Sequence, residues 1–174
     1  FILSIIVYLM AIVTANIVTV VFSPLHIFGF IVTWGTWFIG ATFILRDLVQ
    51  QRYGRVVAYK TIAGAVALSI ILSIWQGGLL YITIASALSF FVSETADTEI
   101  FTRISSSFTN RVLLSGLVGG LLDSVIFVLV GLSPIGANIL PWGAVTMAVL
   151  GQWIVKSLLQ GIGVLMINLS LRVR

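Results

Sequence analysis

Long apolar segments alternate with short polar connections along this chain. Six of these segments contain about 20 or more mainly apolar residues, the length at which an α-helix crosses a hydrocarbon core about 30 Å thick. The predicted helices are Phe1–Phe22, Ile27–Gln50, Val56–Trp75, Leu79–Arg103, Arg111–Leu132 and Trp142–Leu171. Continuous hydrophobicity, as in Ala65–Trp75, favours helices over the short alternating strands of a transmembrane barrel.

The composition agrees with a lipid environment. Of 174 residues, 60% are hydrophobic and 8% are charged, which is too apolar for a water-soluble surface. No linker or low-complexity tract divides the chain. We therefore expect an all-α membrane protein, with one six-helix transmembrane domain over residues 1–174. The first segment lacks a basic leader and a small-residue exit, so we expect a permanent helix and not a signal peptide.

Basic residues predict the orientation, because Lys and Arg near helix ends are retained on the cytoplasmic side. They flank the second and fourth connections and the C-terminus, at Arg46, Arg52, Arg55, Lys60, Arg103, Arg111, Arg172 and Arg174. The other three connections contain no Lys or Arg. This pattern predicts a multi-pass protein of the cytoplasmic membrane with both termini inside. Orientation also explains the net charge of +4, and we expect no nucleic-acid partner.

Lys156 lies in the middle of the last predicted helix, too deep to reach either surface easily. Gln152 and Gln160 stand four residues on either side and share its helical face. A charged residue at this depth costs about 2.5 to 3.5 kcal/mol and commonly faces a functional interior. Asp123, followed by Ser124, is the candidate partner at the same depth. A purely structural ion pair is the alternative.

Further polar residues extend this candidate site. Glu94 and Asp97 lie three residues apart in the cytoplasmic half of the fourth helix, and Asn16 is the buried polar residue of the first. Trp153 lies beside Gln152 and could stack on a planar ligand, whereas the remaining tryptophans suit an interfacial belt.

Two more acids lie near the predicted inner ends of helices. Asp47 and Glu99 are close in sequence to Arg46, Arg52 and Arg103. Ion pairs or caps near the cytoplasmic interface are at least as good an explanation for these acids as contact with a substrate.

The sequence offers few of the residue sets that catalysis requires. With one histidine and no cysteine, there is no metal-binding helix and no Ser-His arrangement. Asp97 and Asp123 do not stand in the settings that intramembrane aspartyl proteases use. We expect no enzyme, no catalytic residue, no metal site and no cofactor.

Four blocks carry a family resemblance: Arg46–Arg55 (RDLVQQRYGR), Ser93–Arg103 (SETADTEIFTR), Gly119–Phe127 (GGLLDSVIF) and Gly151–Lys156 (GQWIVK). In this order they resemble the VUT family, the queuosine precursor transporters. The resemblance implies import of a deazaguanine base such as queuine, through a six-helix fold similar to the substrate-binding (S) components of energy-coupling-factor (ECF) transporters. By motif position it implies substrate contacts from Glu94, Asp97, Asp123, Gln152 and Lys156, with Asn16 from the first helix.

The sequence departs from this family at Ser115-Gly116, where many relatives have Ser-Asn, and in the segment after Lys156. An amide contact is therefore absent there, and the choice among deazaguanines stays open.

Three functions remain open from the sequence. The chain could be a transporter by itself, or a substrate-capture subunit that needs an ATP-driven energising module. The pattern from Ala11 to Ala15 (AxxxA) resembles the docking surface of such subunits. It could also be a structural protein whose polar residues and Gly116/Gly120 pair serve helix association alone. The expected partners are a purine-like small molecule and the lipid bilayer, and a second copy of the chain stays open.

Overall fold

The computed structural model describes the backbone of residues 2–75 and 80–172, without the side chains of residues 2–4, 16, 20, 73, 80 and 167–172. Within this part, each of the six predicted segments contains an α-helix. These are α1 (Ile2–Val21), α2 (Gly35–Tyr53), α3 (Arg55–Trp75), α4 (Leu80–Arg103), α5 (Phe108–Ile126) and α6 (Trp142–Arg172). The predicted helix boundaries at Phe1 and Leu79 lie outside the described residues.

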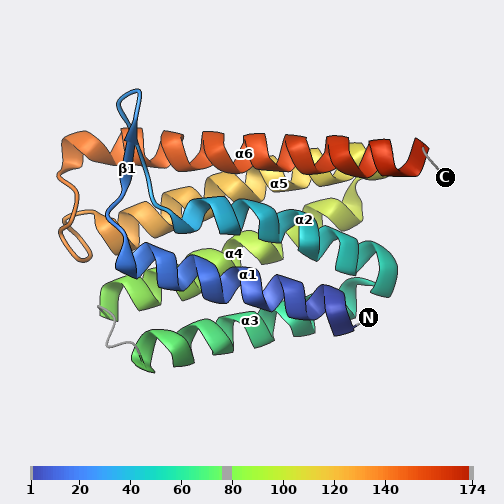
Figure 1. Ribbon diagram of the computed structural model, residues 1–174, viewed down its shortest axis with the longest axis horizontal. Helices are drawn as coiled ribbons and strands as arrows, with labels where there is room; N and C mark the ends of the chain where they lie inside the picture. Colours follow the sequence, from blue (N-terminus) through green and yellow to red (C-terminus); the bar gives the residue numbers. More distant parts are fainter. Residues whose placement is uncertain (1, 76–79, 173–174) are drawn as a thin grey trace.

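The helices run side by side along the long axis of the molecule (Figure 1). Helix α4 packs against α3 and α5, α2 packs against α1 and α6, and α5 packs against α6. The bundle has two distinct ends. The hairpin end carries the strands β1 (Leu25–Ile27) and β2 (Phe30–Val32), and the basic end carries the α2–α3 and α4–α5 connections with Arg52, Arg55 and Arg103.

The prediction of a helix from Ile27 was wrong. Residues 25–32 form an antiparallel hairpin in which Ile27 pairs with Phe30, and α2 begins only at Gly35. Phe28 and Gly29 have φ values of 50° and 83°, the left-handed values that a two-residue hairpin turn of type I′ requires. Strand β2 packs on α6 at Gly151, where an added Cβ would lie 2.8 Å from the Phe30 Cβ. The apolar sequence of residues 25–32 also suits a helix. The segment forms a strand pair where β2 packs on α6.

The fifth helix differs from the prediction at both ends. It begins at Phe108, about one turn before Arg111, because the Ser107 hydroxyl accepts a hydrogen bond from the Asn110 backbone N–H and caps the helix. Beyond Ile126 the coil widens into a π-helix over Phe127–Leu132. Wide turns of this kind are rare and occur frequently at functional sites.

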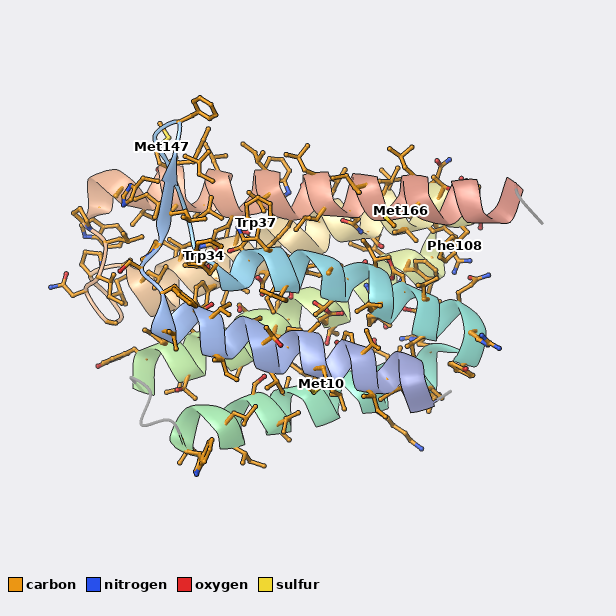
Figure 2. The ribbon with its side chains drawn as sticks, viewed as in Figure 1. Met10, Trp34, Trp37, Phe108, Met147 and Met166 are labelled. Atoms are coloured by element: carbon orange, nitrogen blue, oxygen red, sulfur yellow. The ribbon has the colours of Figure 1, made fainter. Side chains whose placement is uncertain are left out.

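The bundle exposes many large apolar side chains and buries several charged ones. Met10 of α1 and Met166 of α6, both labelled in Figure 2, are 57% and 66% exposed. Buried side chains include Arg46, Glu94 and Lys156, each exposed by 2% or less. Three helical stretches in the described residues are long and apolar enough to cross a membrane: Arg55–Leu72, Phe108–Leu132 and Trp142–Met166. This distribution is that of a protein surrounded by lipid.

Candidate functional site

Lys156 binds a carboxylate deep between α5 and α6. Its Nζ lies 2.6 Å from Asp123 Oδ2 and donates a second hydrogen bond to Ser124 Oγ at 2.9 Å. The lysine side chain is 2% exposed and the aspartate side chain 8%. Gly120 lies beside this pair, and a Cβ added there would be 3.6 Å from the Lys156 Cβ, an ordinary van der Waals distance. The predicted partnership of Lys156 and Asp123 is therefore present in the structure.

A cavity with an empty volume of about 570 Å³, including the space at its mouth, opens beside this ion pair. The cavity wall comes from α1, α2, α4, α5, the π-helix and α6. Its polar lining consists of Thr19, Thr33, Thr36, Ser86, Ser89, Asp123, Gln152 and Lys156, and Phe90 and Phe127 contribute aromatic rings. Hydroxyl groups, an amide and an ion pair therefore face one shared space.

Gln152 presents a donor without a partner to this cavity. The side chain is 1% exposed, and its Nε2 has no hydrogen-bond partner among the described residues. Leaving a buried amide unbonded costs about 1 to 3 kcal/mol, so such a group commonly awaits water or a ligand. Lys156, one helical turn along α6, is directed to the same cavity. The Gln152 Nε2 amide is thus available to donate a hydrogen bond to an acceptor.

A second ionic cluster lies nearer the basic end, and its centre is Arg46 of α2. The guanidinium donates to Glu94 Oε2 at 2.9 Å from Nε and to Thr98 Oγ1 at 3.0 Å from Nη1. It also forms ion pairs with Asp47, at 3.0 Å, and with Asp97. All four charged side chains are completely buried. We call Arg46, Asp47, Glu94 and Asp97 the Arg46 cluster.

The Arg46 cluster lies beyond the cavity along two helices. On α4, Glu94 follows the cavity residue Phe90 by four positions, a rise of about 6 Å toward the basic end. On α2, Arg46 follows Gly40 by six positions, about 9 Å, and Gly40 itself packs on the Lys156 backbone. The cavity and the cluster therefore form consecutive layers along the bundle.

The structure divides the predicted site residues into separate groups. Asp123, Gln152 and Lys156 line one cavity, whereas Glu94 and Asp97 contact Arg46 in the next layer. Trp153 does not line the cavity, because its indole Nε1 donates to the Leu117 carbonyl 2.9 Å away. The side chain of Asn16 lies outside the described residues.

The acids near the basic end follow their predicted pairing in part. Glu99 pairs with Arg55, and with Arg103 at 3.5 Å, on the exposed face. Asp47 pairs with Arg46, and both side chains are completely buried within the bundle. Sequence reasoning treated Arg46 as an orientation signal and missed its central position. The available signal was its spacing to Gln50, one turn later on the same face, whose side chain accepts from Arg46 at 2.9 Å.

Residues 72–169, more than half of the chain, match the sequence model of a family described as "Putative vitamin uptake transporter". The chain belongs to this family. No curated protein and no solved structure matches it. The matched part of this vitamin uptake transporter family member runs from the end of α3 into α6 and includes Asp123, Gln152 and Lys156. Membership places the chain among membrane proteins for small-molecule uptake.

Proposed function

We propose that the protein imports a queuosine precursor, a deazaguanine base such as queuine, across the cytoplasmic membrane. The observation that carries this proposal is the unpartnered Gln152 amide beside the Lys156–Asp123 pair in one cavity. Family membership supports uptake of a small molecule. The resemblance of the Asp123 and Gly151–Lys156 blocks to queuosine precursor transporters supports the choice of base.

The chemistry of the cavity suits a guanine-like edge. Such a base carries adjacent N–H donors, which a carboxylate accepts two at a time, and an oxo group that accepts from an ammonium or an amide. Asp123 supplies the acceptor, and Lys156 and Gln152 supply the donors. Phe90 and Phe127 offer aromatic surface to a flat heterocycle. Glu94 and Asp97, being bound to Arg46, have no direct substrate contact in this proposal.

The membrane arrangement follows from charge and is part of the same proposal. All six helices span the bilayer, with the basic end in the cytoplasm and the hairpin end outside. The cavity then opens from the outer half, and release toward the cytoplasm requires movement of helices at the basic end.

Equilibrium binding of queuine to the purified protein tests the proposal, with Lys156→Met compared with Lys60→Met. These are the chain's two lysines, and Lys60 is exposed on α3, so its loss serves as the matched control. We expect saturable binding to the wild type and to Lys60→Met. Affinity should fall about tenfold to a hundredfold in Lys156→Met, as loss of a charge-assisted hydrogen bond predicts.

A folding control accompanies this measurement, because Lys156→Met leaves Asp123 buried without its partner, at a cost of about 3 to 5 kcal/mol. The double variant Lys156→Met/Asp123→Asn removes the unpaired charge and should recover thermal stability without recovering binding. Wild-type affinity in Lys156→Met contradicts the proposed site. Absence of saturable binding for queuine, guanine and adenine favours a purely structural protein.

The alternative function is a substrate-capture subunit that depends on an ATP-driven module. Its sequence support, the Ala11–Ala15 pattern, is weakened by packing: Ala15 is 2% exposed, and its carbonyl would lie 2.6 Å from a Cβ at Gly35. Uptake of labelled queuine into liposomes that contain only this chain separates the two functions. Binding without uptake favours the capture subunit.

A further inference from the structure

The Arg46 cluster closes the route from the cavity to the basic end by joining α2 to α4. Arg46 bonds to Glu94, Asp97 and Thr98 on α4, and Gln50 adds a hydrogen bond from its amide to Thr102 Oγ1 at 2.9 Å. The contacts to Glu94, Asp97 and Thr98 are buried and the one to Thr102 is partly buried, and all of them lie beyond Phe90, the last cavity residue of α4. A passage toward the basic end between α2 and α4 must break them. By position, the cluster is a gate.

The charges of this gate do not balance. The cluster holds one guanidinium and three carboxyl groups, all with completely buried side chains. Asp123, the remaining buried acid among the described residues, is already paired with Lys156. Uncompensated buried charge costs several kcal/mol, and a carboxylate avoids this cost by taking up a proton. The closed gate therefore holds at least one protonated carboxyl group.

The surrounding groups do not supply enough positive charge to balance the three carboxyl groups. Tyr8 of α1 interacts electrostatically with all four cluster members, yet its completely buried hydroxyl has no hydrogen-bond partner among the described residues. Arg111 of α5 interacts electrostatically with Asp47 and keeps its charge while its Nε donates to the Phe101 carbonyl, so even with Arg111 two guanidinium groups face three carboxyl groups. On α3, Tyr59 is bound to Glu99, and on α6 Lys156 is bound to Asp123.

Glu94 is the member best placed to exchange this proton. Its Oε2 accepts from Arg46, and its Oε1, like the carboxyl oxygens of Asp47 and Asp97, is buried without a hydrogen-bond partner among the described residues. Glu94 is also the cluster member of α4 that lies one turn from the cavity residue Phe90. It also interacts electrostatically with Asp123, which lines the cavity. Glu94 therefore faces the gate with one oxygen and leaves the other available for a proton that arrives from the cavity side.

We propose that the Arg46 cluster is a proton-carrying gate, with Glu94 as the carrier, and that each release of substrate toward the basic end also releases a proton. This inference rests on the proposed transport function. In the closed gate Glu94 is a neutral carboxylic acid. When α2 and α4 separate, water reaches the group, the O–H bond breaks, the proton passes to water and a carboxylate remains. Before the next closure the carboxylate takes up a proton from the cavity side.

The first test needs no substrate. Infrared spectra of the purified protein at neutral pH should contain the C=O stretch of a protonated carboxylic acid, and Glu94→Gln should remove that band. Glu99→Gln is the matched control, because Glu99 is paired with Arg55 outside the cluster, and its variant should keep the band. A band that is absent from the wild type, or that persists in Glu94→Gln and disappears in Asp47→Asn or Asp97→Asn, overturns the assignment to Glu94.

The second test measures coupling in liposomes that contain the protein, with labelled queuine and the membrane potential held at zero. An interior more alkaline by one pH unit should give about tenfold accumulation in wild type and Glu99→Gln, because one coupled proton supplies about 1.4 kcal/mol. The accumulation ratio should fall to about one in Glu94→Gln. Wild-type uptake that equilibrates without responding to the gradient overturns proton coupling.

The two tests separate the failure of this inference from the failure of the proposed function. Absence of any saturable queuine uptake in the wild type rejects the substrate and leaves the infrared result to decide whether Glu94 carries a proton. Normal uptake with no response to the gradient rejects the proton-carrying gate and leaves the transport function standing. If Glu94→Gln does not transport, the comparison of its infrared spectrum with that of Glu99→Gln remains decisive.

Discussion

Gln152 and Gln160 lie on the same face of α6 and are equally buried, yet their amides have different surroundings. Gln160 Nε2 donates to the Val112 carbonyl of α5 at 2.6 Å, whereas Gln152 Nε2 has no partner among the described residues and lines the cavity. One amide therefore holds two helices together, and the other is available to a ligand. Chemical type and burial do not distinguish them, but their hydrogen bonds do.

This difference predicts opposite effects of one substitution. Gln152→Leu should lower queuine affinity about fivefold, the value of one lost hydrogen bond of about 1 kcal/mol, and leave thermal stability nearly unchanged. Gln160→Leu should cost about 0.5 to 1.5 kcal/mol of stability, because the hydrogen bond that joins α6 to the Val112 carbonyl of α5 is lost, with affinity retained. Thermal unfolding and equilibrium binding of both variants check this. Loss of stability in Gln152→Leu with unchanged affinity contradicts the assignment.

Helices α1 and α2 approach closely at Gly35, in the first turn of α2. A Cβ on Gly35 would lie 2.6 Å from the Ala15 carbonyl oxygen and would also overlap the Thr19 hydroxyl. Both helices contribute to the cavity wall here. The absence of a side chain at Gly35 therefore determines how near α1 can come to the cavity.

Gly35→Ala should separate α1 from α2 and destabilise the bundle by about 1 to 3 kcal/mol, because the obstacle is backbone that no rotamer change can move. Gly64→Ala is the matched control, since Gly64 lies within α3 with no atom within 4 Å of its added Cβ. That change should stabilise by about 0.5 to 1 kcal/mol through the helix propensity of alanine. Thermal unfolding of the two variants compares them, and equal melting temperatures contradict the close approach.

The bundle as a unit buries charged groups, exposes large apolar side chains and is basic at one end. Exposed side chains such as Trp75, Leu165 and Met166, at 82%, 63% and 66%, are unfavourable in water and favourable in lipid. The cavity lies nearer the hairpin end, and the Arg46 cluster lies nearer the basic end. The two ends of the bundle therefore differ, and the positive charge of the basic end relates them to the two sides of a membrane.

The proposed orientation can be measured directly, because the chain contains no cysteine. Ile135 is exposed near the hairpin end, and Ser105 is exposed in the α4–α5 connection of the basic end. Each is replaced by cysteine in a separate variant, Ile135→Cys or Ser105→Cys. In intact cells, a membrane-impermeant maleimide should label Ile135→Cys alone, and both sites should react after permeabilisation. Labelling of Ser105→Cys in intact cells reverses the proposed orientation and, with it, the direction of the gate.

The sequence by itself determined the helical class, the positions of the helices and the pairing of Lys156 with Asp123. Helices in lipid need long apolar runs that satisfy their own backbone hydrogen bonds, so length and hydrophobicity locate them without knowledge of neighbours. The ion pair was predictable because a lysine in mid-span requires a carboxylate at the same depth, and the chain has few acids to offer.

The tertiary structure alone decided which acids belong to the cavity and which to Arg46. Glu94 and Asp97 are buried carboxylic acids, as residues that bind a substrate would be. Sequence spacing does not reveal that α2 brings the Arg46 guanidinium into contact with both of them. The hairpin likewise depended on α6, because strand β2 packs closely against α6 at Gly151. In both cases the deciding contact joins elements far apart in sequence, and its energy comes from packing and charge pairing that no local pattern contains.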